Sequence, residues 1–93
     1  MNIHFSTQTE ELVEIEVDEF LERDLIVFND DVNSFDHVID TLIKVCKHTQ
    51  EQAEQCTLII HHNGKCSVKR GSFEKLQPMR SAICDRGISA EIL

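Results

Sequence analysis

Asn29, Asp30 and Asp31 form the first of two polar clusters in this sequence, and they directly follow an apolar run at residues 25–28. An asparagine side chain offers one carbonyl acceptor, and each carboxylate offers several. Such a cluster suits an ammonium group, which brings three N–H donors. The same residue types also favour tight turns, where they accept hydrogen bonds from nearby backbone groups. The local pattern therefore leaves a turn and a binding site both open.

The second polar cluster is His61-His62, which follows the apolar Ile60 near the expected end of a helix. A neutral imidazole nitrogen can accept a hydrogen bond. A histidine at a helix C-terminus can instead interact with the helix dipole or cap the last carbonyls. Either role is compatible with the sequence around these two residues.

Metal binding is disfavoured by the spacing of the possible ligands. Zinc sites usually pair ligands across a tight turn of two to four residues in each half. The candidates here lack such a pair of knuckles: Cys56, His61, His62 and Cys66. The four cysteines, Cys46, Cys56, Cys66 and Cys84, also contain no C-x-x-C pair, so we expect buried free thiols and no disulfide framework.

Catalysis is disfavoured as well. Asp30 or Asp31, His61 and a serine (Ser34 or Ser72) could be drawn as a hydrolytic triad, but no strained nucleophile turn or glycine-rich oxyanion loop accompanies them. The three glycines are not clustered, so a phosphate-binding glycine loop is not expected. We expect a protein that is not an enzyme and uses no cofactor or metal.

The charge is concentrated at the N-terminus. The first 24 of the 93 residues hold eight of the 17 acidic residues and one of the nine basic ones, within a net charge of −8. This distribution argues against nucleic acid as a partner, because phosphate binding needs clustered Lys and Arg. We interpret residues 1–22 as an acidic, partly flexible arm, which is either simply solvated or engages a basic surface on another protein.

The sequence contains neither a run of roughly 18 apolar residues nor a signal-peptide pattern, so we expect a cytoplasmic monomer that binds no membrane. Residues 23–93 are expected to form one domain. Apolar spacing and capping residues predict the order strand, helix, helix, strand, helix, strand. Asn33 or Ser34 should cap the first helix, Thr49 with Gln52 the second, and Ser72 the third.

Five positions at helical spacing should face the core from the first helix: Phe35, Val38, Ile39, Leu42 and Cys46. The second helix should bury Ala53, Cys56, Ile59 and Ile60 and end at Gly64. The third should bury Phe73, Leu76, Met79, Ala82 and Ile83, with Pro78 either kinking it or marking its effective start. Three short strands cannot enclose a core alone. We therefore predict an α/β two-layer domain, a small antiparallel sheet with three helices on one face.

Taken together, the two polar clusters resemble the ClpS family, the adaptors of the bacterial Clp protease. The resemblance rests on "VFNDDVNSFDHVIDTL" followed some twenty residues later by "LIIHHNGK", and it covers roughly residues 24–93. It implies a fold similar to the C-terminal domain of ribosomal protein L7/L12. It also implies binding of substrates that begin with Phe, Tyr, Trp or Leu (an N-degron), and their delivery to a AAA+ unfoldase, ClpA or ClpC.

The resemblance also assigns residues by motif. Asn29, Asp31 and His61 would hold the free α-amino group of the substrate, with Asp30 adding negative potential. Glu74 would contact the unfoldase. The pocket for the first side chain would be lined by Val27, Phe28, Asn33, Phe35, Val38, Thr57 and Ile60, with a contribution from Ile88 or Ala90.

Two positions depart from the family pattern. Phe35 stands where methionine is common, after Asn33-Ser34 in place of Thr-Pro, and Thr57 stands where a methionine often guards the pocket against β-branched residues. The smaller Thr57 predicts weaker discrimination between Leu and Ile or Val. The alternative function is a docking module of L7/L12-like fold that has lost degron recognition.

The acceptor role of His61 predicts a pH dependence. A histidine ordinarily protonates near pH 6.5, and the imidazolium can no longer accept a hydrogen bond. Binding of a peptide that begins with Phe should therefore weaken as the pH falls below about 6.5. A fluorescence titration from pH 8 to pH 5.5 checks this, and an unchanged affinity across that range would contradict the role.

Overall fold

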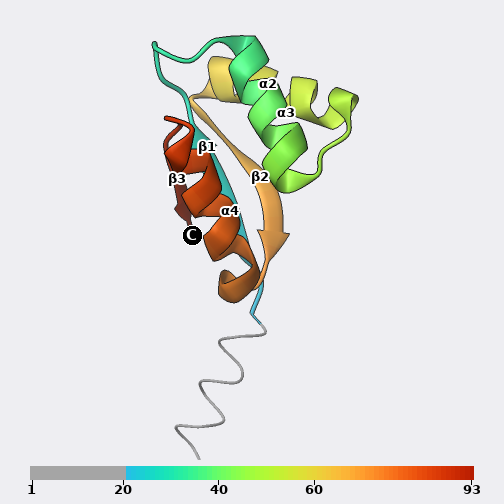
Figure 1. Cartoon of the computed structure of the whole chain (residues 1–93), viewed down its shortest axis with the longest axis vertical. Coiled ribbons are helices and arrows are strands. Elements are labelled where there is room, and N and C mark those ends of the chain that lie inside the picture. The colour runs from blue at the N-terminus through green and yellow to red at the C-terminus, as the bar shows by residue number, and fades with distance from the viewer. Residues whose placement is uncertain (1–20) are drawn as a thin grey trace, which may run out of the picture.

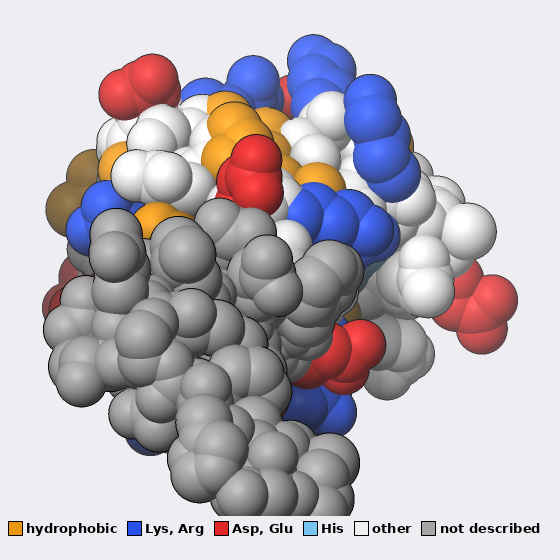
Figure 2. Space-filling model, turned by 90° about the horizontal axis from the view of Figure 1, so that it is seen from below, with side chains coloured by type: hydrophobic (Ala, Val, Ile, Leu, Met, Phe, Trp, Pro, Cys, Tyr) orange, Lys and Arg blue, Asp and Glu red, His pale blue; other side chains and the backbone are white. Residues whose placement is uncertain are grey.

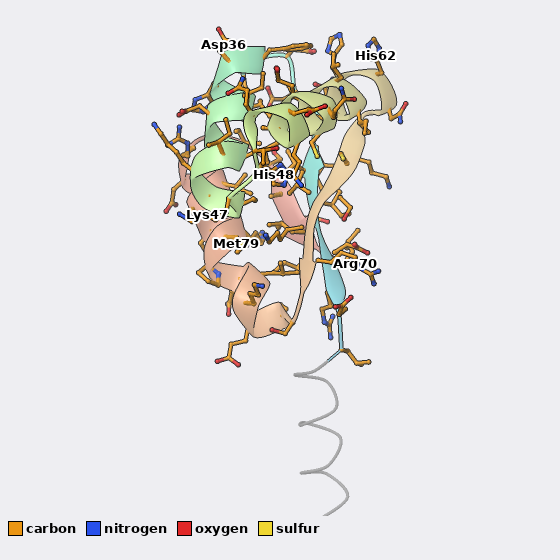
Figure 3. The ribbon with its side chains drawn as sticks, turned by 90° about the vertical axis from the view of Figure 1, so that its right-hand side faces the viewer. Asp36, Lys47, His48, His62, Arg70 and Met79 are labelled. Carbon is orange, nitrogen blue, oxygen red and sulfur yellow. The ribbon has the colours of Figure 1, made fainter. Side chains whose placement is uncertain are left out.

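The computed structural model describes residues 21–93, so of the expected arm at residues 1–22 only the last two fall inside it. The element order is β1 (Arg23–Phe28), α2 (Phe35–Cys46), α3 (Gln50–Asn63), β2 (Lys65–Gly71), α4 (Phe73–Asp85) and β3 (Ala90–Ile92). The strands form an antiparallel sheet with the order β2-β1-β3. The helices pack on one side of this sheet (Figures 1 and 3). The α/β two-layer prediction and its element order are therefore confirmed.

The central strand β1 shows why one face of the sheet is covered. Side chains alternate between the two faces of a strand, and Leu25 and Val27 are both buried, with exposed fractions of 0% and 1%. The register with β2 shifts between Leu25 and Ile26, as at a β-bulge.

At the start of β1, the Arg70 side chain lies 3.3 Å from Asp24 and 3.7 Å from Glu22. Figure 2 shows this lower face, where basic side chains stand with single acidic ones among them.

All three helix starts follow the capping prediction. The Ser34 hydroxyl accepts from His37 N–H, so Ser34 and not Asn33 is the N-cap of α2. Thr49 and Gln52 form a reciprocal capping box at α3, and Ser72 caps α4. Gly64 ends α3 with φ 89°, a conformation that glycine adopts without steric cost. Pro78 lies inside α4, five residues after its first residue, so of the two alternatives given for it, marking the helix start is excluded.

The core differs from the predicted one at the helix ends. Phe35, Ile59 and Phe73 were expected to face inward, but each remains about 40% exposed. Phe35 and Phe73 are the first residues of α2 and α4. Two threonines, Thr41 and Thr57, are buried instead. Each hydroxyl donates to the carbonyl four residues earlier, and this bond offsets the cost of burying a polar group.

The four cysteines are free, as predicted, but they are not all buried. Cys46 is buried, Cys56 and Cys66 are half-buried, and Cys84 is exposed, which corrects the expectation for that residue. Burial raises the pKa of the Cys46 thiol to about 11. A thiol with a raised pKa forms little thiolate at neutral pH, so Cys46 behaves as a small apolar core residue.

Candidate functional site

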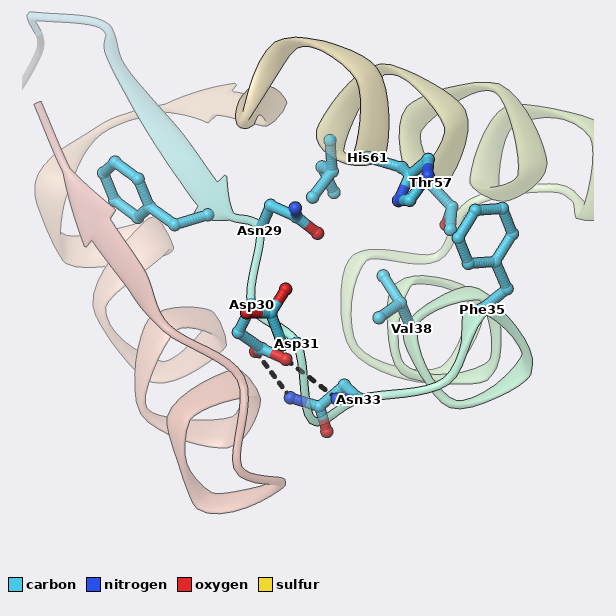
Figure 4. A pocket seen from close by; sticks show the side chains of 10 residues that line it. Asn29, Asp30, Asp31, Asn33, Phe35, Val38, Thr57 and His61 are labelled. Atoms are coloured by element: carbon cyan, nitrogen blue, oxygen red, sulfur yellow. Dashed lines mark hydrogen bonds between the residues drawn. The ribbon is translucent and has the colours of Figure 1, made fainter.

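A pocket of about 260 Å³ lies where β1, α2 and α3 meet. Its wall comes from the end of β1, the turn that follows, the first half of α2 and the second half of α3 (Figure 4). The lining residues are Phe28, Asn29, Asp30, Asp31, Asn33, Phe35, Val38, Thr57, Ile60 and His61. The structure thus brings both polar clusters of the sequence to one hollow. All ten of these residues were among the predicted site residues.

A backbone hydrogen bond at the end of the ladder between β1 and β2 brings the two clusters together. The N–H of Asn29, at the exit of β1, donates to the carbonyl of Gly64, the C-cap of α3, over 2.8 Å. His61 precedes Gly64 by three residues, in the last turn of the same helix. The acidic turn and the imidazole therefore face one another across the pocket (Figure 4).

The two aspartates of the turn have different surroundings. Asp30 Oδ1 accepts from the backbone N–H groups of Val32 (2.9 Å) and Asn33 (2.8 Å), and Asp30 Oδ2 accepts from the Asn33 side chain (2.7 Å). The backbone bond from Asn33 is the main cause that lowers the pKa of Asp30. Within residues 21–93, Asp31 makes no hydrogen bond or ion pair and is exposed. Asp30 therefore stabilises the turn by hydrogen bonds, whereas the Asp31 carboxylate is not bonded to the described protein.

His61 is held by ring contacts. Its ring meets the edge of Phe35 at a centroid distance of 5.0 Å and an interplanar angle of 69°, and His62 lies beside it at 5.2 Å and 71°. No protein group between residues 21 and 93 hydrogen-bonds to the His61 ring nitrogens. One nitrogen of a neutral His61 is thus available as an acceptor at the pocket rim.

The rest of the pocket wall is apolar. Val38 and Ile60 are 9% and 3% exposed, and Phe28 and Phe35 also line the pocket. Thr57 is 3% exposed, and its hydroxyl donates to the Ala53 carbonyl over 2.7 Å. Because that bond occupies the hydroxyl proton, Thr57 offers the pocket a methyl group rather than a free donor.

Three residues expected in the pocket wall do not line it. Val27, Ile88 and Ala90 are at most 3% exposed and belong to the core. Val27 and Ala90 are paired across β1 and β3, so their side chains share the sheet face beneath the helices. Glu74 lies in the first turn of α4, exposed and outside the pocket.

Two hydrogen bonds that link the turn and the start of α2 to the end of α4 were not predicted from the sequence. The Asn33 side chain also donates to the Gly87 carbonyl over 2.9 Å, and His37 Nε2 bonds the Arg86 carbonyl over 2.8 Å. These partners lie about 50 residues away in the chain, so no local pattern could indicate them.

Within the described part of the chain, no group of three or more His, Cys, Asp or Glu residues is arranged to hold a metal. Nor does any helix between residues 21 and 93 have the length and apolarity to cross a membrane.

The fold and the pocket define a small two-layer α/β binding domain, and similar structures are known. ClpS2 of Agrobacterium tumefaciens, solved bound to L-phenylalaninamide, superposes with a TM-score of 0.74 at 14% sequence identity, covering 77% of this chain and 94% of that one. At this identity the likeness concerns the fold.

The family model for the ATP-dependent Clp protease adaptor protein ClpS matches residues 22–90, and the chain belongs to this family. Adapter proteins named ClpS from Campylobacter jejuni subsp. jejuni and subsp. doylei are each 45% identical to it over 40 residues. That match covers 43% of this chain and 42% of the length of each relative.

The lowered pKa of Asp30 predicts a pH-dependent contribution to stability. A carboxyl whose folded-state pKa lies below its unfolded value of about 3.9 stabilises the fold above that pH, and this is lost as the pH falls through the folded value. The Asp30→Ala variant should therefore melt below the wild-type protein at pH 7, and the difference should shrink below about pH 4. Asp31→Ala is the matched control and should melt near wild type. Thermal unfolding across this range checks the prediction, and equal destabilisation by both variants would contradict it.

Proposed function

We propose that this chain is an N-degron adaptor. It binds the free N-terminus of proteins that begin with a bulky hydrophobic residue and delivers them to a AAA+ unfoldase of the Clp system. The observation that carries the proposal is that one pocket combines hydrogen-bond acceptors without a partner in residues 21–93 with an apolar wall. The family to which the chain belongs supports the same conclusion.

The polar side of the pocket suits an α-ammonium group. The Asn29 amide oxygen, the Asp31 carboxylate and a neutral His61 nitrogen are acceptors that border the same space. An ammonium group offers three donors and a positive charge, whereas an internal peptide N–H offers one donor and no charge. A site of this composition therefore selects a chain end over an internal peptide bond.

The apolar side suits one hydrophobic side chain. A volume of about 260 Å³ lies just below the range of roughly 300–1,000 Å³ that is typical of pockets for whole small molecules. Val38, Thr57 and Ile60 supply an apolar floor below the acceptors. The ClpS2 structure supports this interpretation, because L-phenylalaninamide joins a free amino group to a phenyl side chain. We expect Phe, Tyr, Trp and Leu as the preferred first residues.

Delivery uses a surface separate from the pocket. Glu74, exposed at the start of α4, is the residue that we expect to contact the unfoldase, ClpA or ClpC. In this role the chain acts in the cytoplasm as a binding protein and not as an enzyme. Its expected partners include neither nucleic acid nor a membrane.

Binding of a short fluorescent peptide that begins with Phe, compared with its N-acetylated twin, tests the proposal. Loss of one charge-assisted hydrogen bond costs about 1.5–3 kcal/mol, which corresponds to roughly 10- to 150-fold in affinity. Acetylation should weaken binding at least this much, and Asn29→Ala, Asp31→Ala and His61→Ala should each act in the same direction. Glu51→Ala removes an exposed carboxylate in the first turn of α3, outside the pocket wall. It is the control and should bind nearly as well as wild type.

The competing function is a docking module of L7/L12-like fold without degron recognition. Such a module would bind neither peptide, or both equally. Either result would refute the adaptor proposal.

Thr57 should set how strictly the pocket rejects β-branched residues. Replacing it with methionine narrows the pocket, so Thr57→Met should increase the preference for peptides beginning with Leu over those beginning with Ile. Differences of one methylene are worth about 1–3 kcal/mol, and a change of about tenfold in the Leu/Ile ratio is expected. Thr57→Val keeps the branched shape and should leave the ratio unchanged. An unaltered ratio in a folded Thr57→Met protein would show that this position does not guard the pocket.

A further inference from the structure

Asn33 stands at the junction between the acidic turn and the end of α4. Its side-chain amide donates one hydrogen bond to Asp30 Oδ2 (2.7 Å) and one to the Gly87 carbonyl (2.9 Å). Its backbone N–H donates to Asp30 Oδ1 (2.8 Å). An asparagine amide has two protons, so both are used, one within the turn and one across to another element.

The Gly87 carbonyl belongs to the segment that links α4 to β3, in which Gly87 has φ 83°. Carbonyls at the end of a helix have no partner within the helix and need one from elsewhere. The neighbouring Arg86 carbonyl is bonded by His37 Nε2, which must donate because a carbonyl oxygen only accepts. Asn33 and His37 therefore bind successive carbonyls at the same place, but only Asn33 belongs to the turn that lines the pocket.

The remaining residues of the turn have little to hold them. Val32 is 90% exposed, and Asp31 has no hydrogen bond within residues 21–93. At the two ends, the Asn29 N–H is bonded to Gly64 and the Ser34 hydroxyl to His37 N–H. Between these two points, the bond from Asn33 to Gly87 joins the turn to the rest of the domain.

We propose that Asn33 is a positioning residue for the amino-group site. Its bridge from Asp30 to the Gly87 carbonyl holds the turn so that Asn29 and Asp31 face His61 before a peptide arrives. A site arranged in advance avoids the cost of ordering it on binding. This inference rests on the proposed function, and it gives Asn33 a role beyond lining the pocket.

Loss of the Asn33 bridge is expected to lower the affinity for the peptide while changing the stability of the fold little. The contact with Gly87 is solvent-exposed, so water can replace the lost amide proton in the folded protein of an Asn33→Ala variant. The turn of that variant is then free to leave the geometry that the ammonium group requires. Asn33→Ala removes both side-chain bonds of the bridge, to Asp30 and to Gly87, while the backbone N–H of residue 33 can still donate to Asp30. Losing the bridge should weaken binding of the free-amine Phe peptide about three- to tenfold, with only a small change in melting temperature.

The experiment compares Asn33→Ala with His37→Ala in the full chain at pH 8, where histidine is ordinarily neutral. His37→Ala removes the bond to the neighbouring Arg86 carbonyl but leaves the pocket wall intact. The expected result is weaker binding for Asn33→Ala and near wild-type binding for His37→Ala, at similar melting temperatures. Wild-type affinity in Asn33→Ala, or equal losses in both variants, would overturn the proposal.

Amide hydrogen exchange supplies a readout that does not depend on peptide binding. The N–H groups of Val32 and residue 33 both donate to Asp30 Oδ1, so they should exchange faster in Asn33→Ala and remain as protected as in wild type in His37→Ala. Unchanged exchange in Asn33→Ala would refute the positioning role even if the peptide failed to bind wild type. If the wild-type protein does not bind the Phe peptide, this result would instead refute the proposed function, whatever the exchange data show.

Discussion

The hydrogen bond from the Asn29 N–H to the Gly64 carbonyl is the contact on which the site depends. It joins the exit of β1 to the end of α3, and these two points lie 35 residues apart in the chain. Gly64 can present its carbonyl there because it ends the helix in a left-handed conformation that other residues adopt only at a cost. Beside it, Phe28 pairs with Lys65 in the ladder between β1 and β2, so the bond extends this pairing into the turn and places the acidic turn next to the end of α3.

The turn divides its two carboxylates between two tasks. Asp30 accepts three hydrogen bonds from its own turn and has a lowered pKa, so its charge is already engaged in the free protein. Asp31 is exposed, and no group within residues 21–93 hydrogen-bonds to its carboxylate. Of the two interpretations of the N-D-D sequence, turn chemistry is observed at Asp30, and binding stays a proposal for Asp31.

On the other side of the pocket, Thr57 and His61 differ in their hydrogen bonding. Thr57 is buried with its hydroxyl bonded to the helix backbone, so the floor of the pocket is apolar. His61 is oriented by the rings of Phe35 and His62, which leaves its nitrogens free of bonds to the described protein. An apolar floor beneath unengaged acceptors is the arrangement expected where an amino group and a hydrophobic side chain enter together.

The sequence alone determined the order of the elements and the helix starts, because apolar periodicity and N-caps act over a few residues. Ser34, Thr49 and Ser72 all cap as predicted. It also indicated all ten residues that line the pocket, through motifs that resemble a known family. Only the tertiary structure placed Val27, Ile88 and Ala90 in the core, left Phe35 at the rim, and engaged Asp30 rather than Asp31. These outcomes depend on strand pairing and on contacts such as that of Asn33 with Gly87, between residues too far apart in the chain for any local pattern to record.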